Sequence, residues 1–249
     1  EARRPLVQLA SHYSVIALMN PGRKPDIKAH IQYERNIADL AYGITAYQSM
    51  VSDVLILGEN GYVNNVAGRN MLRWDYPFTK QPWFKAAVDD NPGKGFKTLG
   101  LHKQDYLSSY NVFSYNQYTF SVALPVKGYN GQTIGAAIAN LDLDRFNSLF
   151  ELSSYQDNED IFMIDDDRTI IVNKRSDSIG EKLDFPGINI LAKRPSGSLI
   201  STIGGKEQLV TYHPTSTPSI RIVSTIPMSE IRKQSDQLRG YLAGIMYLC

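Results

Sequence analysis

Few side chains of this 249-residue chain have the spacing that catalysis or metal binding requires. Its four histidines lack the H-x-x-x-H type of spacing that brings two ring nitrogens to one metal ion. Asp165, Asp166 and Asp167 form an acidic run without the glycine and glutamate of an EF-hand loop, so we expect a solvated turn. Phosphate-loop, nucleophile-elbow and dinucleotide-binding motifs are missing. The sequence therefore predicts a non-catalytic binding domain with no metal and no cofactor.

Other side chains have the chemistry of a small-molecule pocket. Asn140 and Asp142 stand two residues apart in an expected strand, so both would project from one face. Asp142 could instead cap the helix that we expect from Asp144 onward. Trp83 and Phe84 could line a pocket or could belong to the core of an amphipathic helix.

Tyrosine is abundant, with 15 copies, and several tyrosines fall in a loop-rich stretch from residue 93 to 116. Tyr106, Tyr110 and Tyr115 could form a lid over a pocket or could decorate the surface. Arg73 could pair with an anionic group of a ligand, or it could form a surface salt bridge.

The bulk composition excludes some partners. The chain has 26 basic and 25 acidic residues, so it offers no basic field for a nucleic acid backbone. The single cysteine, Cys249, rules out a disulfide framework. The length suffices for one large domain or two small modules.

The periodicity of apolar residues predicts helices first and strands afterwards. Residues 6–17 and 37–44 keep helical spacing, and Asn20-Pro21-Gly22 separates them, which gives a helical region over 1–50. After Met50 short apolar runs alternate with turns, and Asn60-Gly61 and Asn130-Gly131 predict hairpins.

The pattern of strands occurs twice. An apolar strand, a polar turn and a strand that ends in asparagine begin at Val54 and again at Ile161. Further strands are expected at 118–126, 133–141, 198–203, 207–212 and 220–226, with helices at 83–88 and 144–152. We therefore expect an α+β fold with two antiparallel-sheet modules, over 51–153 and 154–228, that follow a long N-terminal helix.

The C-terminal residues 229–249 are expected to form a helix. The uncharged run from Tyr241 to Cys249 follows Arg232, Lys233 and Arg239, as at the start of a membrane-spanning segment, although a short amphipathic terminal helix is the alternative. We expect a first membrane segment before Glu1.

Two motifs resemble the double Cache family of extracellular sensors, whose modules are PAS-like. Residues 81–87 (QPWFKAA) are similar to the family's Pro-Trp-aromatic helix, and residues 135–146 (GAAIANLDLDRF) to its strand-into-helix motif. The order of the motifs resembles that family along essentially the whole chain. The resemblance implies the extracellular, ligand-binding sensor of a cell-membrane receptor. A histidine kinase is the favoured output, and a chemoreceptor or a cyclic-dinucleotide enzyme is the alternative.

The resemblance also implies a ligand site in the membrane-distal first module. Tyr76 and Trp83 match pocket-lining positions of family members that bind amino acids, and Phe84 stands where those members have a tyrosine. Gln81 replaces the arginine that pairs with the ligand's carboxylate, and Asn140 replaces the aspartate that takes its ammonium. With Tyr106, Tyr110 and Asp142, these residues are the candidate site.

Both charged anchors are thus replaced by neutral amides. An arginine fork makes two charge-assisted hydrogen bonds, whereas a glutamine offers one neutral amide. We therefore expect a neutral polar ligand rather than a free amino acid. A protein-interaction ectodomain without a small-molecule ligand is the rival, and the N-terminal helix offers a stripe for a homodimer.

Overall fold

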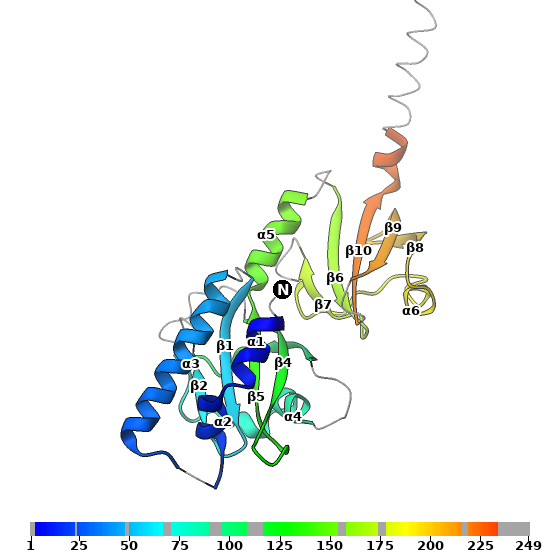
Figure 1. The fold of residues 1–249 in the computed structure, drawn as a ribbon. Coiled ribbons are helices and arrows are strands. Elements are labelled where there is room, and N and C mark those ends of the chain that lie inside the picture. The colour runs from blue at the N-terminus through cyan, green and yellow to red at the C-terminus, as the bar shows by residue number, and fades with distance from the viewer. Residues whose placement is uncertain are drawn as a thin grey trace, which may run out of the picture. The chain divides into compact units, whose positions relative to one another are not determined.

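The computed structural model describes residues 3–22, 24–47, 50–66, 71–89, 96–108, 117–153, 158–173, 178–215 and 219–233. The chain divides into two compact units, residues 1–145 and 146–249. Each unit contains a five-stranded antiparallel sheet (Figure 1). The expected α+β fold, with a long N-terminal helix and two sheet modules, is confirmed.

Three helices form the N-terminal region: α1 (Arg3–Ala10), α2 (Tyr13–Met19) and α3 (Ile27–Tyr47). The single helix expected over residues 6–17 is in fact two, because the chain breaks at Ser11 and His12. The Nδ1 atom of His12 accepts a hydrogen bond from the backbone N–H of Ser14 at 3.3 Å and so caps α2. Asp26 caps the start of α3 through the N–H of Ala29 at 2.8 Å.

The sheet of the first unit has the order β2-β1-β5-β4-β3. Its strands are β1 (Val51–Gly58), β2 (Val63–Asn65), β3 (Lys97–Lys103), β4 (Tyr118–Lys127) and β5 (Thr133–Leu141). Strand β3 was not expected from the sequence, which predicts a loop there. Its register shifts between Thr98 and Gly100, where Gly100 has a φ of 74°, so the residue alternation that marks a strand is interrupted.

Each face of this sheet is covered by a different set of helices. On one face Val54, Ile56 and Ala137 pack in a core with α1, α2 and α3. On the other face Leu55, Leu57 and Ile138 pack against the short helix η1 (Phe78–Lys80) and α4 (Pro82–Val88). We call the second side the α4 face, and it carries the candidate site.

Strands β1 and β5 approach each other closely at a pair of glycines. Gly58 pairs with Gly135 in the register, and a Cβ atom at Gly135 would overlap the carbonyl oxygen of Leu57. Glycine is therefore required at position 135 for the two strands to meet.

The second unit repeats the strand order of the first, as β7-β6-β10-β9-β8. The strands are β6 (Asp160–Asp165), β7 (Ile170–Asn173), β8 (Gly197–Ile203), β9 (Lys206–Pro214) and β10 (Ile220–Pro227), with helix α6 (Ile190–Lys193). Helix α5 (Leu143–Ser153) follows β5 in the chain. The expected duplication of the fold is thus seen in the identical strand order of the two sheets. The hairpin between β6 and β7 turns at Arg168, which has a φ of 65°.

The part of the C-terminal region that the structure describes is short. Residues 228–233 are helical, and residues 234–249, which carry the expected start of a membrane segment, lie outside the described residues. Among the helices described, none combines the length and the apolar character needed to cross a membrane.

Candidate functional site

A β-bulge at the start of β1 places a carboxylate on the α4 face. Val51 pairs with Leu141 and Asp53 pairs with Asn140, so Ser52 is the extra residue. The bulge lets Val51 pack with the helices α1 to α3, whereas Asp53 projects from the same face as Leu55 and Leu57. Asp53 is only 4% exposed.

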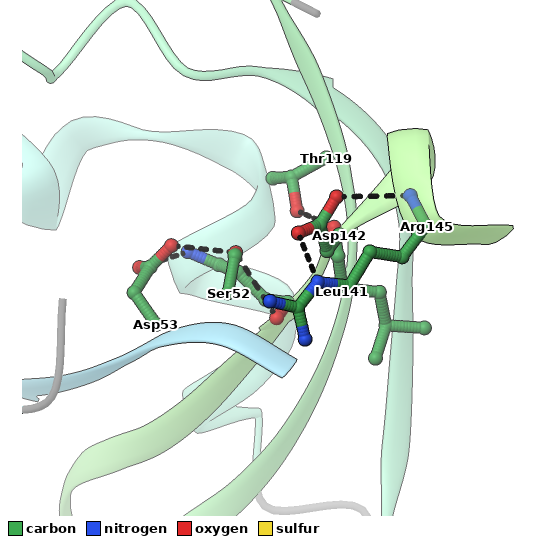
Figure 2. A network of polar contacts seen from close by, with 7 residues as sticks. Ser52, Asp53, Thr119, Leu141, Asp142 and Arg145 are labelled. Atoms are coloured by element: carbon green, nitrogen blue, oxygen red, sulfur yellow. Dashed lines mark hydrogen bonds and ion pairs between the residues drawn. The ribbon is translucent and has the colours of Figure 1, made fainter. Parts of the chain in front are cut away.

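Three polar side chains form a row across the three central strands of the α4 face. The Nδ2 group of Asn140 on β5 donates to Oδ1 of Asp53 on β1 at 2.7 Å. On the other side, the hydroxyl of Ser121 on β4 donates to Oδ1 of Asn140 at 2.5 Å. The second oxygen of Asp53 accepts from the Ser52 hydroxyl at 2.8 Å, as Figure 2 shows. We call Asp53, Asn140 and Ser121 the polar row.

The carboxylate of Asp53 is buried without a cationic partner among the described residues. Burial disfavours its charged form and raises the pKa of Asp53 above the ordinary 3.8, although the hydrogen bonds from Ser52 and Asn140 act in the opposite direction. Burial, together with the charge of Asp53, also raises the pKa of Tyr106 far above 10.0. The polar row therefore contains a buried acidic group on a sheet face that is otherwise apolar.

An aromatic cluster adjoins the polar row on the α4 face. The Tyr106 ring lies 5.7 Å from Phe78, 5.8 Å from Tyr76 and 6.0 Å from Trp83, measured between centroids. The Nδ2 group of Asn140, which also donates to Asp53, donates its second hydrogen bond to the hydroxyl oxygen of Tyr106 at 2.9 Å. Tyr106 thus connects the aromatic cluster to the polar row.

His102 on β3 extends the aromatic cluster by stacking on Trp83. The two ring centroids are 5.0 Å apart and the planes differ by 13°. Both ring nitrogens of His102 are screened from solvent, and neither has a hydrogen bond of good geometry in the part of the chain that the structure describes, although the nearby backbone of Gly100 acts to raise the pKa of the ring. Burial lowers the pKa of His102 to about 4, so the ring is neutral at physiological pH.

Two loop segments hold Tyr76 and Tyr106 in place. The N–H of Arg73 donates to the carbonyl of Tyr106 at 2.8 Å, and Leu72 forms an isolated β-bridge with Leu107. The Tyr76 hydroxyl donates to Oδ1 of Asp105 at 2.7 Å. These contacts fix the two rings side by side.

A cleft of about 570 Å³ reaches the aromatic cluster from outside. Its lining residues lie between Gly61 and Thr79 in the chain and include Asn64, Trp74, Tyr76 and Phe78. Trp74 is 97% exposed at this cleft. The cleft gives a solute access to Tyr76 and Phe78, which both contact Tyr106.

The structure brings together four of the residues expected in the site. Tyr76, Trp83, Phe84 and Tyr106 lie in one cluster on the α4 face, and Asn140 is bonded to it through Tyr106. Phe84 is buried in the core of this cluster. Tyr110 and Tyr115 lie outside the described residues.

Gln81 and Asp142 do not join the polar row. The side-chain amide of Gln81 donates to the carbonyl of Pro77 at 3.3 Å. Asp142 follows the end of β5 and caps α5, since its Oδ1 accepts from the N–H of Arg145 at 3.1 Å and its Oδ2 lies 3.3 Å from Nε of Arg145 (Figure 2). The expectation that Asn140 and Asp142 share a pocket face is thus corrected, and the capping alternative is the one observed.

Of the two roles expected for Arg73, the structure shows the surface salt bridge. Its guanidinium forms a salt bridge with Asp75 at 3.0 Å on the surface, and it donates to the carbonyl of Asp105 at 3.4 Å. Asp53, in contrast, was missed, because the strand expected from the sequence begins only at Val54. A carboxylate directly before a fully apolar strand was the available signal.

Comparison with known proteins gives one family and a group of solved structures. Residues 5–235 match the double Cache family of Cache domains. The sequence has no significant match among curated proteins.

The similar solved structures are sensor domains. The extracellular domain of a protein described as a histidine kinase, rpHK1S-Z16, has a TM-score of 0.62 and 13% identity, over 92% of this chain and 94% of that one. The ligand-binding domain of the Pseudomonas aeruginosa amino acid chemoreceptor PctB, in complex with L-Gln, has a TM-score of 0.62 and 14% identity, over 96% and 89%. That of PctC from the same organism, in complex with GABA, has a TM-score of 0.58 and 14% identity, over 89% and 88%. At these identities the likeness concerns the fold.

Proposed function

The chain belongs to the double Cache family, and on this premise we propose that it is the extracellular ligand-binding sensor domain of a cell-membrane receptor. The first unit is the membrane-distal module and holds a small-molecule ligand. A histidine kinase is the favoured output, and the similarity in fold to the extracellular domain of rpHK1S-Z16 supports it. A chemoreceptor output is the alternative, which the similarity to PctB supports.

One observation carries this proposal: the polar row is buried on an otherwise apolar sheet face. Asn140 and Ser121 are 0% exposed, and they neighbour Ile138 and Ala123 on that face. Buried polar groups in such a place contribute less to stability than apolar side chains would. Their presence therefore favours a role other than stability. Convergent polar groups beside aromatic walls are the usual composition of a small-molecule pocket.

The position of Asn140 supports a route from the ligand to the rest of the receptor. Asn140 lies two residues before Asp142, which caps α5, and α5 continues into the second unit. A ligand that binds one arrangement of Asn140 and Tyr106 more tightly shifts the population of that arrangement. Because α5 joins the two units along the chain, it is the segment through which the shift would pass to the second unit.

The side chains present bear on the class of ligand. Gln81 supplies no positive charge, so the site does not favour a ligand that needs its carboxylate paired. The sequence-based prediction of a neutral polar ligand rests on this residue and on Asn140. Because the carboxylate of Asp53 lies beside Asn140, the neutral amide at position 140 no longer argues for a neutral ligand.

A thermal-shift screen of the 249-residue chain with a metabolite library tests the proposal. A ligand present at about 100 times its Kd contributes about 2.7 kcal/mol of stability, which raises the melting temperature by several degrees. At least one solute should give a saturable shift that an Asn140→Ala variant loses. The absence of any saturable shift across the library would contradict a small-molecule sensor.

A second candidate function is a protein-interaction ectodomain. Trp74 and Met71, at 97% and 64% exposed, are large apolar side chains at the mouth of the cleft. If the cleft serves a protein partner, the metabolite screen will be negative and a Trp74→Ala variant will lose a partner captured by the wild-type ectodomain on intact cells.

We further propose that the receptor is a homodimer. Ile27 and Ile31 are one helical turn apart on α3 and are 82% and 47% exposed. A two-fold partner would bury both side chains against their own copies. Sedimentation of the wild-type chain and of an Ile31→Glu variant tests this, because a dimer through α3 should dissociate in the variant.

A further inference from the structure

We propose that the cleft beside β2 binds a short extended peptide, which adds to the outer edge of β2 as a further strand. This site is distinct from the polar row, whose side chains do not line the cleft. The proposal goes beyond the small-molecule function of the first unit and does not rest on it.

The first argument is the direction of the backbone groups of β2. Among the described strands, β2 lies at one end of its sheet and pairs only with β1. The carbonyl of Tyr62 accepts from the N–H of Gly58 at 2.8 Å, and further along Val66 donates its N–H to the carbonyl of Val54 at 3.0 Å. Antiparallel pairing alternates along a strand, so Val63 directs its N–H and carbonyl away from β1. Within the described residues no backbone group pairs with them.

The second argument is the opposite wall of the cleft, which contains another extended segment. The residues on either side of Leu72 exchange backbone hydrogen bonds with the segment 106–108, whereas Leu72 itself forms a bridge with Leu107 that contains no hydrogen bond. The N–H and carbonyl of Leu72 therefore point away from Leu107. Leu72 lines the cleft together with Val63. An extended peptide in the cleft thus has backbone partners at β2, and Leu72 offers further ones.

The third argument is that the two edges of this sheet differ in their protection. Strand β3, at the other edge, begins and ends with lysine, and its register shifts near Gly100. Charged side chains and bulges are the usual means by which an edge strand avoids pairing with another chain. Strand β2 reads Val-Asn-Asn, without charge or proline, and its described pairing with β1 is regular. The edge at β2 is therefore the one at which a further strand can pair.

The side chains around the cleft favour an apolar residue in the peptide. Val63 is aligned with Leu57 in the register, so its side chain projects from the α4 face. A peptide residue opposite Val63 presents its side chain to the same face, where Tyr76 and Phe78 line the cleft. Trp74 adds an exposed apolar ring at the mouth. An apolar side chain at this position is therefore preferred to a charged one.

The size of the cleft favours a short free peptide over a folded partner. Its volume of about 570 Å³ falls within the range of about 300–1,000 Å³ that is usual for small-ligand sites. A strand at the edge of a folded partner would also keep its neighbouring strand on the side where Leu72 lies. A peptide of a few residues has no such neighbour.

The test measures the binding of blocked pentapeptides, acetyl-Thr-Val-Xaa-Val-Thr-amide, to the 249-residue chain by titration calorimetry. The central residue is phenylalanine, leucine, methionine, serine, aspartate or lysine. We expect at least one of the peptides with an apolar centre to bind at least about ten-fold more tightly than the aspartate peptide.

Backbone pairing is tested with two N-methylated forms of the tightest binder. One form is methylated at both valines and the other at the central residue, so the side chains are kept and each form loses N–H donors on one edge. At least one of the two should bind at least about ten-fold more weakly than the parent peptide.

The substitution arm is Val63→Pro, compared with Val63→Thr. Proline removes the outward N–H of position 63 without removing a hydrogen bond to β1, and edge strands tolerate proline at such positions. Threonine keeps the N–H and a β-branched side chain of similar size. We expect the proline variant to bind the peptide at least about ten-fold more weakly, and the threonine variant to bind it as the wild type does.

Three results would overturn the proposal. The first is that none of the pentapeptides binds, as for a partner that needs a folded surface. The second is that both N-methylated forms bind as tightly as the parent, and the third is equal binding to Val63→Pro and to the wild type. The comparison of parent and N-methylated peptides uses the wild-type chain, so it decides even if Val63→Pro fails to fold. The metabolite screen tests the small-molecule function separately, so each proposal can fail alone.

Discussion

Oδ1 of Asp53 lies 2.7 Å from Nδ2 of Asn140, although the two residues are 87 positions apart in the chain. The pairing follows from the sheet order, in which β1 and β5 are neighbours, and from the bulge at Ser52 that aligns Asp53 with Asn140. One carboxylate and one amide are thus buried side by side, and the N–H of the amide pairs with an oxygen of the carboxylate. The chemistry at position 140 can therefore be judged only together with position 53.

Asn140→Asp should destabilise the first unit at neutral pH. Two carboxylates would then meet at hydrogen-bond distance without a cation, and the amide donor to Asp53 and to Tyr106 would be lost. We expect a loss of about 3–5 kcal/mol in the free energy of unfolding at pH 7, as for other buried charges left without a partner. Thermal unfolding at pH 7 measures this.

The exchange variant Asp53→Asn/Asn140→Asp is the matched control. It keeps one acid and one amide and exchanges their positions, so most of the lost stability should return. A double variant as unstable as Asn140→Asp would show that the side chains at these positions act independently.

Asp53→Asn should change how stability depends on pH. The folded-state pKa of Asp53 is raised above 3.8, so the folded chain holds a proton that the unfolded chain releases. The wild type therefore loses stability as the pH rises from about 3.8 through the raised pKa, and the variant lacks this loss. Unfolding measured in pH steps upward from 3.5 should show the variant gaining stability relative to the wild type once the pH rises above about 3.8. Parallel curves would mean that Asp53 is charged and well solvated in the fold.

Much of the fold could be predicted from the sequence because local signals are strong there. The hairpin between β4 and β5 turns at Asn130-Gly131, and Gly131 has a φ of 80°, which is the conformation that the Asn-Gly pair favours. Strand β3 escaped prediction because Gly100 shifts its register, so apolar and polar residues do not alternate. Its place at the sheet edge is set by pairing with β4, which the sequence does not show.

The aromatic residues of the candidate site were named from the sequence, whereas its buried carboxylate was not. Trp83 and Tyr76 belong to a recognisable motif, whereas Asp53 comes into the site only through a bulge and a non-local strand pair. Asp142 shows the opposite case. Its spacing from Asn140 suggested a shared face, but β5 ends at Leu141, so the carboxylate caps α5 instead.

Gly135→Ala should destabilise the first unit more than its small size suggests. The new methyl group would overlap the carbonyl of Leu57, and backbone atoms cannot move aside as a side chain can. We expect a loss of about 1–3 kcal/mol. Gly43→Ala in α3 is the matched control, because nothing lies within 4 Å of its added methyl, and it should stabilise the helix by about 0.5–1 kcal/mol. Chemical denaturation of the two variants measures both values, and equal effects would contradict the close approach of β1 and β5.

His102→Phe should protect the chain against mild acid. Burial lowers the pKa of His102 from 6.5 to about 4, so between these values the unfolded chain binds a proton that the folded chain does not. This histidine's contribution is therefore present above pH 6.5 and lost as the pH falls towards 4. A phenylalanine can keep the stack on Trp83 without titrating. The variant should gain about 2–3 kcal/mol on the wild type between pH 6.5 and 4, since one pKa unit corresponds to about 1.4 kcal/mol.

Thermal unfolding at half-unit pH steps measures this gain. Substitution of His213 by phenylalanine serves as the control, because that side chain is exposed on β9 in the second unit and has no part in the stack. The His213 variant should follow the wild type more closely than the His102 variant does. If His102→Phe and the wild type lose stability in parallel from pH 6.5 to 4, the imidazole of His102 is not held neutral by the aromatic cluster. Trp83 would then contact a ring that water can reach.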